Sequence, residues 1–80
     1  MTKIDVFNVV KNNILDILPA LQPDMVQIDR NLSDLGANSV DRMDVVISSM
    51  EDLGVKIPLL SFAGVANIEG LVEVLFSNLQ

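Results

Sequence analysis

Few side chains of this sequence could perform chemistry on their own. Its 80 residues include no His and no Cys, so the commonest acid–base group and the thiol nucleophile are both missing. Ser39 is the residue whose position suggests chemistry, because it lies where a long irregular segment meets an acidic segment with helical periodicity. A nucleophilic serine needs a base beside it, so we expect Ser39 to be modified by another protein. We predict no catalytic residue and no metal ligand.

The local capping pattern leaves the Ser39 hydroxyl available for such a modification. One interpretation makes Ser39 the N-cap of the helix, a position that serine often fills. A capping box would then need an acidic or amide side chain three residues later, but Arg42 stands there. With Asn38 as the N-cap, Asp41 falls on the third helical position, where a carboxylate suits the helix dipole. Ser39 is then the first helical residue, and a phosphate on its hydroxyl would lie over unpaired N–H groups.

Three helices are expected to position Ser39. The first is predicted over residues 3–18, where Thr2 and Asp5 resemble a capping box at the start. The second is predicted over residues 39–53, and the third begins after Asn67 as N-cap. Apolar residues at steps of three and four give each helix a face for the core. These faces comprise Phe7, Val10, Ile14 and Ile17, a spacing that Leu21 continues past the helix end; Met43, Val46, Met50 and Leu53; and Ile68, Leu71, Val72, Leu75, Phe76 and Leu79.

The segments between these helices are less regular. Residues 19–38 show no sustained period, and a connection of this length in a small domain is normally functional or held by its own side chains. A helical turn is expected near residues 32–35, and a weaker pattern at residues 59–63 allows a short fourth helix. The sequence therefore predicts an all-α fold, a small bundle of three main helices in a single domain over residues 1–80. Five apolar residues are expected to hold the long loop to the core, namely Leu21, Val26, Ile28, Leu32 and Leu35.

The acidic charge of the sequence is concentrated around Ser39. The formal net charge is −6, and all of it lies within residues 16–52, because acids and lysines balance elsewhere. Such a chain is a poor match for phosphates, so we expect neither nucleic acid nor an anionic membrane as partner. The acidic stretch is either a solvated face or a surface for a basic partner.

No segment of the sequence predicts insertion into or export across a membrane. The longest uncharged run, residues 57–68, contains a proline and a glycine and falls short of the roughly 20 residues that span a bilayer. Charged and polar side chains also interrupt the N-terminal segment, so it does not match a secretory signal. We expect a cytoplasmic monomer.

These motifs together resemble the acyl carrier protein family. The similarity extends over residues 2–80, and it is carried by the run LGANSVD at residues 35–41, by GVKIP at residues 54–58, and by Phe62 before a closing apolar helix. The resemblance implies that Ser39 receives a 4′-phosphopantetheine arm from coenzyme A through a phosphopantetheinyl transferase. The missing cysteine is then understandable, because the arm provides the thiol that holds acyl groups as thioesters. The sequence departs from the family's usual Asp-Ser-Leu, since Asn38 precedes the serine and Val40 follows it.

Residues 35–43 resemble the freestanding donor carriers of polyketide β-branching cassettes more closely than fatty-acid carriers. This resemblance implies an acetyl cargo, formed from a malonyl unit, that a hydroxymethylglutaryl (HMG)-synthase-like enzyme adds to a β-ketoacyl chain on another carrier. A ketosynthase-like decarboxylase and an acyltransferase would be further partners. The open alternatives are a fatty-acid, peptidyl or D-alanyl carrier, or a helical adaptor that is never modified. A calcium sensor is disfavoured, because no Asp-x-Asp-x-Asp-Gly loop is present.

The helix that begins at Ser39 is also the predicted recognition surface. Its acidic side chains are expected to meet basic patches on partner enzymes, and two apolar residues add contact area. A solubilising face that also compensates the helix dipole is the alternative explanation of the same acids. The predicted partner-binding residues are Val40, Asp41, Asp44, Ile47, Ser48, Glu51 and Asp52.

Overall fold

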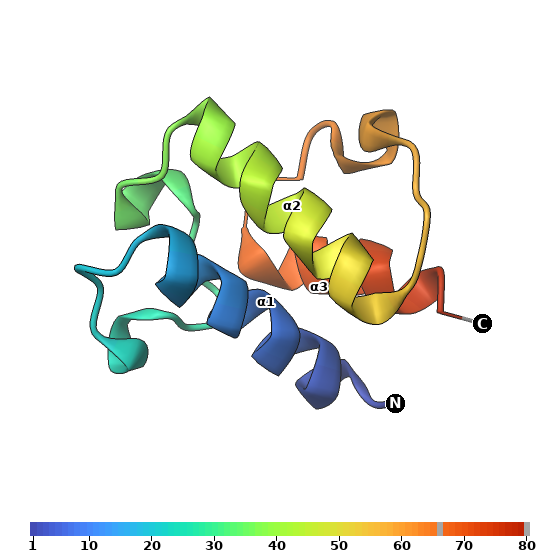
Figure 1. Cartoon of the computed structure of the whole chain (residues 1–80), viewed down its shortest axis with the longest axis horizontal. Helices are drawn as coiled ribbons and strands as arrows, with labels where there is room; N and C mark the ends of the chain where they lie inside the picture. Colours follow the sequence, from blue (N-terminus) through green and yellow to red (C-terminus); the bar gives the residue numbers. More distant parts are fainter. Residues whose placement is uncertain (66, 80) are drawn as a thin grey trace.

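The computed structural model contains three main helices joined by irregular segments with short 3-10 turns (Figure 1). It describes residues 1–65 and 67–79. The helices are α1 (Lys3–Ile17), α2 (Ser39–Leu53) and α3 (Ile68–Ser77), and the 3-10 turns are η1 (Pro23–Met25), η2 (Ser33–Leu35) and η3 (Leu59–Phe62). The all-α prediction is confirmed, including the turn near residues 32–35 and the short fourth helix near residues 59–63. Ala66, in the turn before the third predicted helix, lies outside the described residues.

Helix α1 begins with the capping box that the sequence predicts. The Asp5 N–H donates to Thr2 Oγ1 at 3.2 Å, and the Thr2 N–H donates to Asp5 Oδ2 at 2.8 Å. The backbone hydrogen bond from Thr2, followed by the bond to its side chain, lowers the pKa of the Asp5 carboxyl. The helix ends at Ile17, one residue before the predicted end, because the residue before a proline avoids helical geometry.

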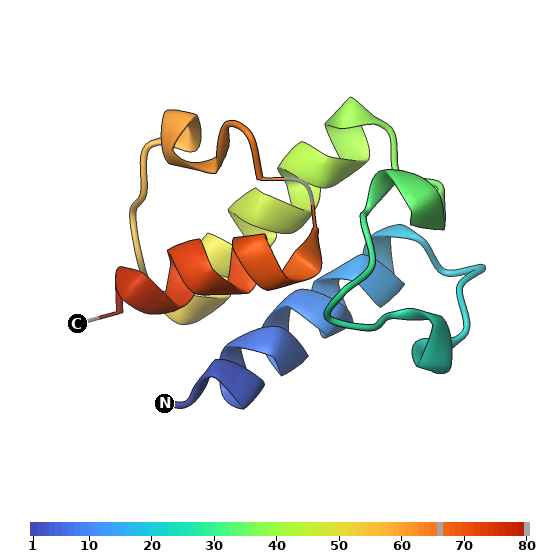
Figure 2. The ribbon, with the colours of Figure 1, turned by 180° about the vertical axis from the view of Figure 1, so that it is seen from behind.

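The core lies where α1 packs against both α2 and α3. Figure 2 shows α3 lying beside α1 on the face opposite to the view of Figure 1. Ile14 from α1, Val45 from α2 and Leu75 from α3 are fully buried there. Each helix thus covers one apolar face of its neighbours, as the spacing at three and four predicts.

The predicted core faces of α1 and α2 are confirmed at Val10, Ile14 and Val46, but each face differs at other positions. In α1 the buried residues include Val6, whereas Phe7 only packs partly against the core. In α2 the buried residues are Val45, Val46 and Ser49, and Met43 is wrongly predicted as core, because it is 45% exposed. The predicted face of α2 was built from apolar residues only. It therefore did not include Ser49, a polar residue that is fully buried.

A polar contact explains why Ser49 is buried. The side-chain amide of Asn13 on α1 donates to Ser49 Oγ at 3.1 Å and to Asp52 Oδ2 at 3.0 Å. Asn13 and Ser49 are both buried. Because an apolar neighbour could not satisfy either group, this contact favours one alignment of α1 against α2.

We expect Asn13→Ala to lower the free energy of unfolding by about 1–3 kcal/mol, because it removes the shared donor and leaves the buried Ser49 hydroxyl without this partner. Urea unfolding followed by circular dichroism measures the change. The control is Asn12→Ala, at an exposed position of the same helix, which should change stability by less than about 0.5 kcal/mol. Equal losses in the two variants would show that the contact has no special role.

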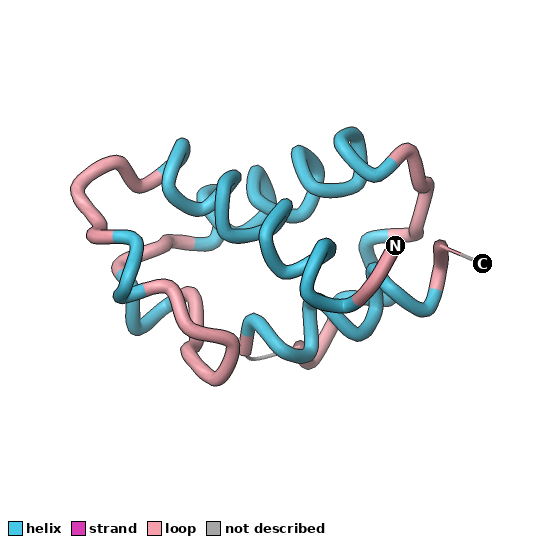
Figure 3. Tube along the Cα trace, turned by 90° about the horizontal axis from the view of Figure 1, so that it is seen from below, coloured by secondary structure: helices cyan, strands magenta, loops and turns pink. Residues whose placement is uncertain are grey.

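The long loop between α1 and α2 is attached to the core and to α3. Val26, Leu32 and Leu35 are buried as predicted. Leu21 packs only partly against the core, and Ile28 is 40% exposed, so its predicted anchoring role is wrong. The loop is instead held there by its backbone, because the Glu69 N–H at the start of α3 donates to the Ile28 carbonyl at 2.8 Å. This uses an N–H group that a helix leaves unpaired at its start. In Figure 3 this segment is drawn as pink stretches that are interrupted by the short helical turns η1 and η2.

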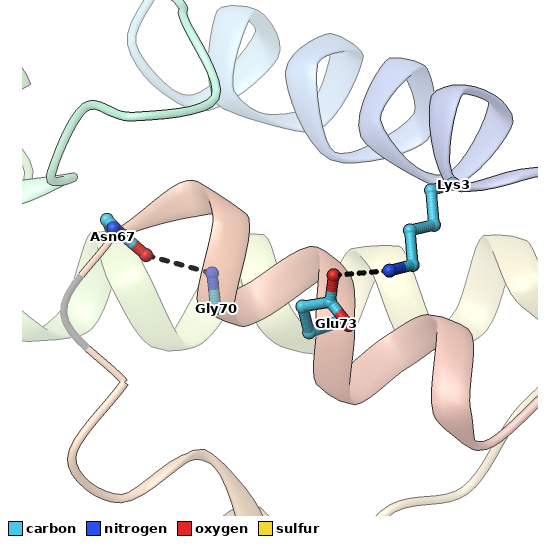
Figure 4. A network of polar contacts seen from close by, with 4 residues as sticks. All are labelled: Lys3, Asn67, Gly70 and Glu73. Carbon is cyan, nitrogen blue, oxygen red and sulfur yellow. Dashed lines mark hydrogen bonds and ion pairs between the residues drawn. The ribbon is translucent and has the colours of Figure 1, made fainter.

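An ion pair closes the opposite end of the bundle. Lys3 Nζ lies 2.6 Å from Glu73 Oε1 and joins the start of α1 to α3 (Figure 4). The same ammonium lies 5.7 Å from the centroid of the Phe76 ring, within the range of a cation–π contact. Within residues 1–65 and 67–79, no helix is both long and apolar enough to cross a membrane.

Candidate functional site

Ser39 is the first residue of α2, as the capping argument predicts. The Asp41 N–H donates to Asn38 Oδ1 at 2.8 Å, and the Asn38 N–H donates to Asp41 Oδ2 at 3.2 Å. Asn38 is therefore the N-cap, and this reciprocal pair is a capping box. Ser39 is exposed, and its hydroxyl takes no part in the cap. A group attached to that oxygen can project into solvent without disturbing the start of the helix.

We expect Asn38→Ala to lower the free energy of unfolding by about 1 kcal/mol, because it removes the side-chain acceptor for the Asp41 N–H. Asn38→Asp should change stability by only a few tenths of a kcal/mol, since aspartate is a comparable N-cap. Thermal unfolding of the two variants and the parent chain tests this difference. If Asn38→Asp is as destabilised as Asn38→Ala, the amide has a role beyond capping.

A cleft of about 300 Å³ opens beside Ser39. It lies between the first half of α2, the turn η3 and the start of α3. Its walls are largely apolar and include Leu32, Val46 and Phe62, whereas Arg42 and Asn67 add polar groups. Val65 in the cleft wall packs closely on Gly70 of α3, where a Cβ would lie 3.1 Å from Cγ1 of Val65. The cleft can therefore receive a flexible chain that starts at Ser39.

The seven predicted partner-binding residues divide into two groups. One group forms an exposed row along α2 at steps of four, three and four, starting next to Ser39. The other group lies outside this row, and two of its members already have partners within the chain, since Asp41 closes the cap and Asp52 accepts from Asn13 on α1. The exposed row comprises Val40, Asp44, Ile47 and Glu51, and the second group comprises Asp41, Ser48 and Asp52.

The surface near Ser39 also has exposed apolar residues on α2 and η3. The sequence did not predict that they are exposed. Met43 on α2 and Leu59 on η3 are each 45% exposed and line the cleft. Leu60 beside them is 82% exposed. The periodicity placed Met43 in the core, and the weak signal at residues 59–63 gave no orientation. No signal in the sequence distinguishes the exposed leucines from buried ones, because exposed apolar residues are normal on a folded surface.

Among the residues that the structure describes, no group of three or more acidic side chains could hold a metal ion. The acids of α2 are instead spread along the length of the helix. A spread of this kind suits contacts with several basic side chains of a protein surface better than coordination of one cation.

Comparison with known proteins gives consistent findings. Residues 8–75 match the family model described as a phosphopantetheine attachment site. The chain is 40% identical over 80 residues to the polyketide biosynthesis acyl-carrier-protein AcpK of Bacillus subtilis (strain 168), covering 100% of this chain and 98% of that protein. It also superposes with a TM-score of 0.85 on a chain of the crystal structure of the curacin biosynthetic pathway HMG synthase in complex with acetyl donor-ACP. That match has 34% identity and covers 95% of this chain and 96% of the other.

Proposed function

Because this chain belongs to the acyl carrier proteins with a phosphopantetheine attachment site, we propose that Ser39 is the serine that carries the 4′-phosphopantetheine arm. The observation that carries this assignment is the cap of α2. Asn38 and Asp41 satisfy the start of the helix between them, so the Ser39 hydroxyl is exposed and has no structural task. We further propose that residues 1–80 act as one carrier domain.

The residues around Ser39 fit the arm. The N–H groups of Ser39 and Val40 are the first of the helix and have no acceptor within it, so they can face a phosphate attached at Ser39. The apolar walls of the cleft suit the methyl-bearing and methylene parts of the pantetheine chain, and the amide of Asn67 can pair with one of its amide groups. When bound, the arm supplies a thiol that holds an acyl group as a thioester.

The chain itself contributes position and protection rather than bond-making. A phosphopantetheinyl transferase would bring coenzyme A to Ser39, where a bond forms between Oγ and the β-phosphorus. The bond between the two phosphates breaks, the adenosine bisphosphate half leaves, and the hydroxyl proton is lost. We expect the transferase to supply the base for this step, because the sequence has no histidine and the nearby Asp41 already closes the cap.

We propose an acetyl-donor role in polyketide β-branching for this carrier. The support is the likeness, at 34% identity and a TM-score of 0.85, to a chain from a complex of HMG synthase with an acetyl donor carrier. An HMG-synthase-like enzyme would take the acetyl group, and a ketosynthase-like decarboxylase and an acyltransferase would prepare it. The exposed row on α2, with Asp44 and Glu51, would meet basic side chains of these enzymes in the cytoplasm.

Intact-mass spectrometry tests the carrier function. The parent chain is incubated with Mg²⁺, coenzyme A and a broad-specificity phosphopantetheinyl transferase, and it should gain the mass of one arm. No gain, under conditions that modify a control carrier, would overturn the proposal.

Loading assays then test the cargo. The arm-bearing chain is offered acetyl, malonyl and aminoacyl donors in parallel, and acetyl transfer to an HMG-synthase-like enzyme is followed by mass. Productive transfer of acetyl alone supports the donor role. Selective loading with aminoacyl groups would favour a peptidyl or D-alanyl carrier instead.

A further inference from the structure

Arg42 is the only basic residue of α2, in a helix that also contains Asp41, Asp44, Glu51 and Asp52. Side chains on a helix meet their neighbours three and four positions away. For Arg42 these neighbours are Asn38, Ser39, Val45 and Val46, and none is acidic. Arg42 therefore has no acidic neighbour at these positions of α2 with which to form an ion pair.

The guanidinium of Arg42 also lacks an acidic partner elsewhere in the described residues. There the one ion pair within 4.0 Å joins Lys3 to Glu73, at the other end of the bundle. Arg42 is exposed and lines the cleft together with Ser39. Because side chains of a helix lean toward its N-terminus, Arg42 is directed back over the turn that contains Ser39.

From this arrangement, and building on the attachment at Ser39 proposed above, we propose that Arg42 is a positioning residue for the arm. Its guanidinium pairs with the phosphodiester that links the arm to Ser39 and holds the first part of the arm over the mouth of the cleft. This assigns to Arg42 a task within the carrier itself.

The electrostatics of the site explain why such a group is useful. A phosphodiester on Ser39 carries one negative charge and would lie in the same helical turn as Asp41, whose carboxylate repels it. The helix N-terminus offsets only part of this repulsion. A guanidinium has a planar fork of donors that matches two phosphate oxygens, which a lysine ammonium cannot reproduce. For an exposed ion pair we expect the population in which Arg42 contacts the phosphodiester to exceed the population without this contact by about two- to five-fold.

Nuclear magnetic resonance of the unmodified and the arm-bearing chain tests this proposal. The sequence contains only two arginines, Arg30 and Arg42, so a ¹⁵N-labelled sample gives two arginine Nε–H signals. Arg30 is exposed on the loop between α1 and α2 and serves as the internal control. On attachment of the arm, the Arg42 signal should shift and the Arg30 signal should stay. Raising the salt from about 0.01 M to 1 M shortens the Debye length from about 30 Å to 3 Å and should reduce the shift.

Two matched variants extend the test to the phosphate. In the arm-bearing chain, Arg42→Gln should change the ³¹P shift of the phosphodiester, Arg42→Lys should change it less, and Arg30→Gln should leave it unaltered. An arm confirmed by mass, with no response of the Arg42 signal or with equal responses of both arginines, would overturn the role of Arg42 alone. A chain that gains no arm by mass would overturn the attachment at Ser39, and the role of Arg42 with it.

Discussion

Ser39→Ala should abolish attachment of the phosphopantetheine arm and leave the fold intact. The attachment needs an oxygen nucleophile at the start of α2, and alanine provides none. The fold should not suffer, because Asn38 rather than Ser39 caps the helix and alanine is the best helix former. The parent chain should be modified completely, and Ser39→Ala should show no detectable gain in mass. The free energy of unfolding should change by less than about 0.5 kcal/mol.

Ser61→Ala is the matched control for this result. Ser61 is also exposed, and it lies on η3, the turn that borders the same cleft. This variant should be modified as completely as the parent chain, because Ser61 does not stand at the start of an α-helix. Modification of Ser39→Ala, or loss of modification in Ser61→Ala, would contradict the assignment. Unfolding of Ser39→Ala would be detected by circular dichroism and would show that the capping argument is wrong.

The position of Ser39 could be predicted from the sequence because it depends on interactions within a few residues. The choice between Ser39 and Asn38 as N-cap follows from which residue stands three positions later, and Arg42 excludes one of the two. The ends of α2 follow from the same local rules, since Gly54 adopts the left-handed conformation with φ of 69° that stops a helix. Local chemistry therefore predicts almost completely where Ser39 lies in the fold.

The cleft and the alignment of the helices could not be predicted in the same way, because they depend on residues far apart in the chain. Asn13 and Ser49 are 36 positions apart, and neither is apolar, so a search for hydrophobic stripes passes over both. Met43 fits the apolar period of α2 but is 45% exposed, and it lines the cleft instead of the core. Burial depends on which partner lies opposite, and a single helix pattern carries no information on that.

Reversing the charge of Asp44 and Glu51 to lysine should weaken productive docking with an HMG-synthase-like enzyme by about 30-fold. Both acids belong to the exposed row of α2 that starts beside Ser39. Each reversal replaces an attraction of about 0.5 kcal/mol by a repulsion of similar size, so the two together cost about 2 kcal/mol. The kcat/KM for acetyl transfer from the arm-bearing chain measures the loss, which should shrink at high salt.

The control for this experiment is Asp24→Lys with Asp29→Lys, which changes the net charge by the same amount on the loop between α1 and α2. If the row on α2 is the docking surface, this control should keep kcat/KM within about two-fold, because the reversed charges lie outside that row. Equal losses in the two double variants would mean that docking depends on the net charge of the chain and not on the acids of this row. Unchanged transfer in both would leave the acids of α2 as a solubilising face, and the contact would then rest on the apolar side chains around Met43 and Leu59.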